Sequence, residues 1–112
     1  MHIRDNQRYS IITNDLMHCI VCGRGDVNLH EIFGGRNRQN SKDYGLVIPL
    51  CQEYHHNQYK SIGIHFDKKL MDYWHIKGQE IAMQHYNWTE EEFRKIFYKS
   101  YIKGDNYGNE KW

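Results

Sequence analysis

The chain has 112 residues, with fifteen lysines and arginines against fourteen aspartates and glutamates. This length predicts one domain over 1–112, and the near-neutral balance excludes a protein that coats DNA through its overall charge. The mean hydropathy of −0.89 predicts a small core, of the kind that often depends on a bound metal. No run approaches the roughly 20 apolar residues of a membrane span, and the N-terminus has no apolar signal segment. We therefore expect a cytoplasmic protein without membrane contact.

The first half of the chain predicts an arm followed by two strands. Residues 1–17 are polar with scattered Ile and Tyr, which is typical of an arm that packs late. Residues 27–33 alternate in a period of two and predict a strand. The polar residues 34–45, with glycines at both ends, predict a loop. Residues 45–50 predict a second strand, and Pro49 places it at a sheet edge or at a strand end.

The second half of the chain predicts helices. Residues 51 to about 59 lose the alternation and are compatible with a helix. Asp67 is a candidate cap for the next helix, although Gly78 weakens its middle. Thr89 and Glu92 form a capping box for the last helix. Apolar residues recur on one face of these two helices: Leu70, Trp74 and Ile81 on the first, and Phe93, Ile96, Phe97 and Tyr101 on the second.

The cysteines have the spacing of a structural zinc site. Cys19 and Cys22 form a CxxC pair, and Cys51 supplies a third thiolate at the end of a predicted strand. The fourth ligand is His55 or His56, and His55 is favoured because position i+4 lies on the same helical face as Cys51. The Gly-rich turn after Cys22 lets backbone amides point toward the thiolates. The alternative is that the three thiols are buried core residues.

Four residues remain for a second, reactive centre: His30, Glu31, His56 and His65. A histidine on a strand and a histidine on the following helix can converge on one ion. The alternative for each histidine is a hydrogen-bonded structural or surface position.

Several segments together resemble a known family of nucleases. They are residues 29–35 (LHEIFGG), 42–51 (KDYGLVIPLC), 55–57 (HHN) and 63–66 (GIHF). They are similar to the small HNH endonucleases, and more narrowly to the zinc-bearing phage members of the ββα-metal superfamily, near the phage recombination-enhancement nucleases. The resemblance covers about residues 18–66, and the helix after Glu92 is also similar to the terminal helix of those proteins. It implies an α+β fold with a ββα-metal core, a zinc knuckle and two further helices in 67–112.

The resemblance also implies a single-metal mechanism with Mg²⁺ or Mn²⁺ beside a structural Zn²⁺. The ion would neutralise the scissile phosphate and stabilise the leaving oxygen. His30 corresponds to the strand histidine and is expected to be the general base or a ligand. His56 and His65 correspond to ligands of the catalytic ion. Glu31 is expected to be a ligand, an alternative base or a bystander.

The best candidates for nucleic-acid contact are four residues in the predicted loop: Arg36, Asn37, Arg38 and Lys42. Arginine and lysine bind phosphates without reading sequence, and asparagine can bond to backbone or base. Taken alone, these residues could equally form a solvated loop. Beside a phosphate-cleaving centre they favour contact with duplex or single-stranded DNA.

Two functions follow from these patterns. The first is a metal-dependent DNA endonuclease, which the presence of His30, His56 and His65 around the zinc residues favours. The second is a zinc-stabilised, non-catalytic binding module, acting as an adaptor or inhibitor toward DNA or a phage or host protein. The near-neutral charge favours the second function. So does the absence of the family's mid-motif asparagine, near whose place Tyr44 and Gly45 stand.

Overall fold

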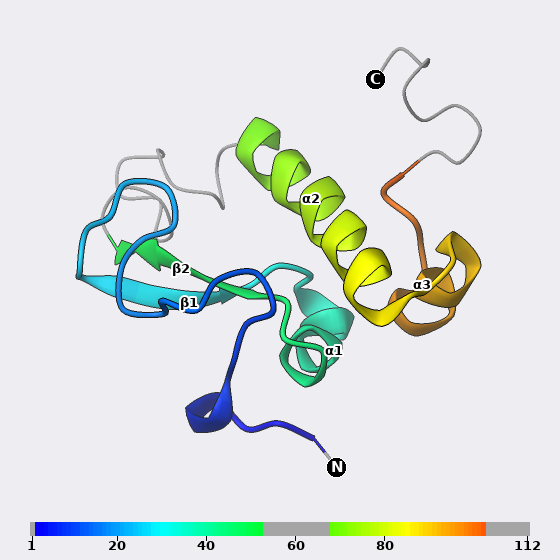
Figure 1. Cartoon of the computed structure of the whole chain (residues 1–112), viewed down its shortest axis with the longest axis horizontal. Coiled ribbons are helices and arrows are strands. Elements are labelled where there is room, and N and C mark those ends of the chain that lie inside the picture. The colour runs from blue at the N-terminus through cyan, green and yellow to red at the C-terminus, as the bar shows by residue number, and fades with distance from the viewer. Residues whose placement is uncertain (1, 53–67, 103–112) are drawn as a thin grey trace.

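The structure is a computed structural model that describes residues 2–52 and 68–102 (Figure 1). Its elements are η1 Asp5–Gln7, β1 Val27–Glu31, η2 Gly35–Asn37, α1 Arg38–Asp43, β2 Val47–Cys51, α2 Lys68–Tyr86 and α3 Glu90–Phe97. The described part is thus a small α+β fold with a two-stranded sheet and three α-helices. The helix predicted at 51–59 and the cap Asp67 lie outside the described residues. Within that described part, no helix has the length and apolar character that crossing a membrane requires.

The two strands pair antiparallel, with Val27 opposite Cys51 and His30 opposite Ile48. Side chains alternate between the faces of a strand, so His30 and Cys51 belong to opposite faces of the hairpin. Pro49 lies inside β2, and its carbonyl accepts a hydrogen bond of 2.9 Å from the amide of Ile20. Among the described residues the sheet has two strands, so each is an edge strand, in line with the edge position predicted from this proline.

The strand predicted over 27–33 ends earlier, at Glu31. The strand ends because the side chain of Ser41 takes the place of a partner strand in the hydrogen bonds of the Phe33 backbone. The Ser41 hydroxyl accepts from the Phe33 amide at 3.0 Å and donates to the Phe33 carbonyl at 2.8 Å. The backbone of Phe33 is therefore satisfied by Ser41 instead of by a partner strand, and the chain leaves the sheet.

The predicted loop at 34–45 is wrong, because the structure has η2 and α1 there. The polar side chains that suggested a loop bind backbone groups inside the fold. The side-chain amide of Asn37 donates to the Phe97 carbonyl at 2.8 Å, and the side-chain amide of Asn40 donates to the Ile96 carbonyl at 3.0 Å. The polarity of these two asparagines therefore reflects contact with the end of α3, whereas Arg36 and Arg38 are exposed.

Helix α2 lies against the segment that leaves β1, and Gly78 makes this approach possible. A Cβ atom at Gly78 would lie 3.1 Å from Cγ2 of Ile32 and 3.4 Å from Cε2 of Phe33. Ile32 and Phe33 are themselves buried, at 2% and 1% exposure. Gly78, which has low helix propensity, is thus suited to this position because a larger residue would crowd Ile32 and Phe33.

Helix α3 confirms the predicted capping box. The Thr89 hydroxyl accepts from the Glu92 amide at 3.1 Å, and the Glu92 carboxylate accepts from the Thr89 amide at 2.8 Å. The helix ends at Phe97, because Tyr98 turns into the left-handed region at φ 75°. Tyr101 is therefore off the predicted helical stripe, yet its ring still packs 5.1 Å from that of Phe33.

The N-terminal arm packs across α1 and the end of β1 (Figure 1). The Asp43 carboxylate accepts from the Ile3 amide at 2.8 Å, and the amide of Ile11 donates to the Gly45 carbonyl at 2.9 Å. Arg8 reaches further and donates to the Glu31 carboxylate at 2.6 Å. These contacts bring the arm beside the residues predicted to be functional.

Candidate metal centre and adjoining pocket

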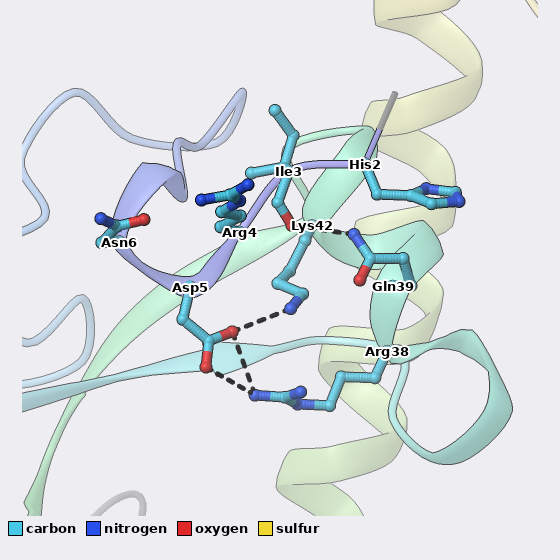
Figure 2. A pocket seen from close by; sticks show the side chains of 8 residues that line it. All are labelled: His2, Ile3, Arg4, Asp5, Asn6, Arg38, Gln39 and Lys42. Atoms are coloured by element: carbon cyan, nitrogen blue, oxygen red, sulfur yellow. Dashed lines mark hydrogen bonds and ion pairs between the residues drawn. The ribbon is translucent and has the colours of Figure 1, made fainter.

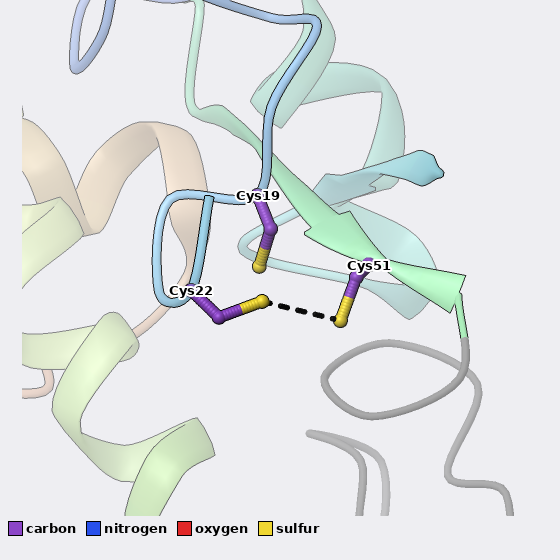
Figure 3. A group of neighbouring side chains, drawn as sticks. All are labelled: Cys19, Cys22 and Cys51. Atoms are coloured by element: carbon purple, nitrogen blue, oxygen red, sulfur yellow. Dashed lines mark hydrogen bonds between the residues drawn. The ribbon is translucent and has the colours of Figure 1, made fainter. Parts of the chain in front are cut away.

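The three cysteines converge at one end of the hairpin (Figure 3). Cys19 and Cys22 come from the turn before β1, and Cys51 is the last residue of β2. Their Sγ atoms all lie within 4.8 Å of one another, and those of Cys22 and Cys51 are 3.7 Å apart. A disulfide would need about 2.05 Å. Two thiolates on a tetrahedral zinc, each about 2.3 Å from the ion, lie about 3.8 Å apart. The geometry therefore fits a metal ion.

Backbone hydrogen bonds hold the cysteine turn in shape. The amide of Gly23 donates to the Cys19 carbonyl at 2.8 Å, and the Cys19 amide donates to the Arg24 carbonyl at 2.7 Å. Gly23 has φ 82°, a conformation that favours glycine. The Gln52 amide donates to the Asp26 carbonyl at 2.8 Å, which ties the turn to the end of β2.

The surroundings of Cys19 favour a thiolate. Burial opposes ionisation of this thiol, but hydrogen bonds from the backbone amides of Cys22, Cys51 and Val21 outweigh it, so the pKa of Cys19 lies below its usual value. The Val21 amide is 3.4 Å from Cys19 Sγ. This is the amide arrangement expected from the Gly-rich turn. The deprotonated form is the one that binds metal.

The structure thus brings together three cysteine Sγ atoms that could bind one ion. His55 and His56, the two candidates for the fourth position, lie outside the described residues. So does His65. Soft thiolate donors suit zinc better than magnesium or manganese, so a metal at the cysteines would be of the zinc type.

His30 lies in a separate place. Val27 is the residue of β1 opposite Cys51, and His30 lies three residues, or about 10 Å, further along the strand. His30 also belongs to the other face of the hairpin. The imidazole is nearly buried, at 6% exposure, and it lines a pocket of about 530 Å³ where β1 ends. Glu31, Arg38, Met71, His75 and Tyr101 also line this pocket. The cysteine group and the His30 pocket are therefore two distinct centres.

Glu31 carries two ion pairs at the edge of this pocket. One carboxylate oxygen is 2.6 Å from Arg8, and the other is 3.3 Å from Nε of Arg38. Only 11% of the Glu31 side chain is exposed. Glu31 therefore links the arm to α1, and this arrangement favours the bystander among the three roles expected for it.

His75 is a pocket residue that the sequence did not reveal. Its ring packs 5.3 Å from the ring of Phe33 and 4.6 Å from that of Tyr101. Burial lowers the pKa of His75 below its usual 6.5, and the opposing charge of Asp72 does not restore it. The imidazole is therefore neutral near pH 7. The pocket forms from segments distant in sequence, and nothing in the spacing around His75 marks it.

The four predicted nucleic-acid residues separate in the structure. Asn37 is buried and holds α3, and the guanidinium of Arg36 lies 3.8 Å over the Tyr98 ring. Arg38 and Lys42 meet at the N-terminal arm, where both pair with Asp5 (Figure 2). The nucleic-acid role of the group stays a prediction; of its four residues, Arg38 and Lys42 lie together around Asp5.

The chain matches no protein-family model, no curated protein and no solved structure. What the described residues define is a small α+β protein whose three-cysteine group can hold a metal ion.

Proposed function

We propose that the chain is a zinc-stabilised, divalent-metal-dependent DNA endonuclease of the HNH type, with a ββα-metal core. The observation that carries this proposal is the position of His30. Its imidazole is nearly buried on a paired strand and lines the same pocket as the guanidinium of Arg38. Phosphodiester hydrolysis needs a proton acceptor beside a cation that holds the phosphate, and these two side chains supply both.

In this proposal the zinc is structural. Cys19, Cys22 and Cys51 would hold it together with His55, or with His56 in its place. The ion would fasten the turn that carries Cys19 and Cys22 to the end of β2. Structural zinc contributes folding free energy directly, which suits a chain with a small core.

The reaction belongs to the His30 pocket. His56 and His65 are the proposed ligands of a Mg²⁺ or Mn²⁺ ion, which would supply positive charge at the scissile phosphate. His30 accepts the proton of the attacking water, for which a neutral imidazole is suited near pH 7. His75 lines the same pocket and, being neutral, can accept a hydrogen bond or a proton there.

Arg38 gives the proposal its connection to DNA. It lines the His30 pocket, and together with Lys42 it also lines a second pocket, which Figure 2 shows. A nucleic-acid backbone that crosses Arg38 would therefore place one phosphate near His30 and a neighbouring phosphate near Lys42. Such contacts position the substrate without reading its sequence, so both duplex and single-stranded DNA are suitable.

A non-catalytic binding module, an adaptor or inhibitor toward DNA or a phage or host protein, is the second candidate. One observation favours it. The Glu31 carboxylate is paired with two arginines, and the Lys42 ammonium is paired with Asp5, so these charges are satisfied within the chain.

A plasmid-nicking assay separates the two candidates. We expect the purified chain to nick supercoiled DNA with Mg²⁺ or Mn²⁺ and to stop when the divalent ion is withheld. Glu31→Gln is tested beside it: near-normal activity makes Glu31 a bystander, and loss of activity makes it a ligand or base. If the wild-type chain cleaves neither duplex nor single-stranded DNA with any divalent ion, the binding module is the better account.

A further inference from the structure

The side chain of Asp5 bridges two cations of α1 (Figure 2). Its Oδ1 atom is 2.8 Å from Nζ of Lys42, and its two oxygens are 3.3 and 3.4 Å from one guanidinium nitrogen of Arg38. A carboxylate held between an ammonium and a guanidinium has the same partners as a phosphate group bound by lysine and arginine.

The exposure of the three side chains is unequal. The Lys42 side chain is 7% exposed, whereas that of Asp5 is 58% exposed and that of Arg38 is 49% exposed. The Lys42 side chain is thus held within the fold, and the Asp5 carboxylate that pairs with it lies at the surface. The hydrogen bond from Lys42 lowers the pKa of the Asp5 carboxyl, so this group is an anion at neutral pH.

The arm does not depend on Asp5 for its place. The Asp43 carboxylate accepts from the Ile3 amide at 2.8 Å, and the side chain of Gln39 donates to the Ile3 carbonyl at 2.8 Å. These bonds anchor the chain before Asp5, and Arg8 anchors it afterwards through Glu31. The Asp5 side chain can therefore turn into solvent while the backbone stays in position.

We infer that the Asp5 carboxylate occupies a phosphate-binding position, and that a backbone phosphate of nucleic acid displaces it from Lys42 and Arg38. The position opens into a cavity of about 610 Å³, which Arg4 and His2 also line. A phosphodiester brings the same single charge as the carboxylate. It also extends to neighbouring phosphates, which Arg4 can meet.

This inference deepens the proposed function and rests on it, since it names the contact through which DNA would reach the His30 pocket. It also gives the arm a regulatory effect. Any nucleic acid must compete with the Asp5 carboxylate, which weakens its binding.

The test compares two substitutions that raise the net charge equally. Asp5→Asn removes the bridging charge and keeps the shape of the side chain. Asp15→Asn is the matched control, because Asp15 is also exposed but pairs with His18, away from α1. The binding of a short mixed-sequence DNA duplex to each protein, without divalent ions, is followed by fluorescence anisotropy at several salt concentrations.

We expect Asp5→Asn to bind the duplex about 5-fold more tightly than Asp15→Asn, the factor that corresponds to losing one competing surface ion pair. Its salt slope should equal that of Asp15→Asn, because both proteins contact the same phosphates once the DNA is bound. Adding Lys42→Gln to Asp5→Asn should abolish the gain. Equal affinities for Asp5→Asn and Asp15→Asn, with both proteins folded by thermal melting, would overturn the inference.

Cleavage is measured separately, so that the two proposals fail separately. If Asp5→Asn binds more tightly and no protein cleaves DNA, the phosphate position stands and the endonuclease does not. If the wild-type chain cleaves DNA and Asp5→Asn binds no better than its control, the endonuclease stands and the role of Asp5 does not.

Discussion

Replacing Cys22 by alanine should remove a metal ligand and little else. Cys22 is exposed, whereas Cys19 and Cys51 are buried, so its truncation sacrifices almost no packing. Surface substitutions normally change stability by about 0.5 kcal/mol or less. Structural zinc is worth about 10–16 kcal/mol in small domains, so an equal share for one of four ligands is about 2.5–4 kcal/mol.

The expected effect is large enough to measure by thermal melting. With an unfolding entropy of about 2.1 cal/mol/K per residue, a loss of about 3 kcal/mol lowers the Tm of a 112-residue chain by about 13 °C. Val21→Ala is the matched control, because Val21 is the neighbouring exposed residue. Zinc content is determined on the same samples, and we expect about one ion per wild-type chain.

The metal can be separated from the side chain by a second pair of melts. After zinc is stripped by a chelator, wild type and Cys22→Ala should unfold alike, because neither protein then has a bound zinc ion. Two results together would refute the zinc site: a wild-type chain that contains no zinc, and a Cys22→Ala protein that melts within about 2 °C of it.

Two further outcomes follow from the packing around the pocket. Gly78→Ala should destabilise the chain by about 1 kcal/mol in urea unfolding, because overpacking against Ile32 and Phe33 outweighs the gain of about 1 kcal/mol in helix propensity; a more stable variant would contradict this contact. Partial burial lowers the pKa of His75, so the unfolded chain binds its proton more readily and stability should fall as the pH drops through about 6.5. His75→Gln should flatten that decline between about pH 7.5 and 5.5, measured at constant zinc. An unchanged decline would show that another group is responsible.

Features set by neighbouring residues were predictable from the sequence. The capping box of α3 depends on Thr89 and Glu92, three residues apart, and the structure has both of its hydrogen bonds. The cysteine group was predictable for a related reason, since a CxxC turn and a cysteine at a strand end have few ways to meet. The first strand followed from the alternation of apolar residues, although it ends at Glu31 and not at Phe33.

Features set by distant segments were not predictable in this way. The residues of α1 look like a loop because their polar groups bond to backbone carbonyls at the end of α3, more than fifty positions away in sequence. His75 enters the pocket only because Gly78 lets α2 approach the end of β1. The pairing of Lys42 with Asp5 joins a helix to an arm that has no pattern of its own.

The most direct test of the proposed chemistry is the rate of single-turnover DNA cleavage by His30→Ala. His18→Ala is the control, since His18 is exposed and pairs with Asp15 outside the pocket. With Mg²⁺ or Mn²⁺, we expect His30→Ala to lose on the order of 100-fold or more in rate, while it keeps the wild-type circular dichroism, and His18→Ala to cleave normally. Equal rates for wild type and His30→Ala would contradict the assignment of the pocket, and no cleavage by wild type would contradict the endonuclease.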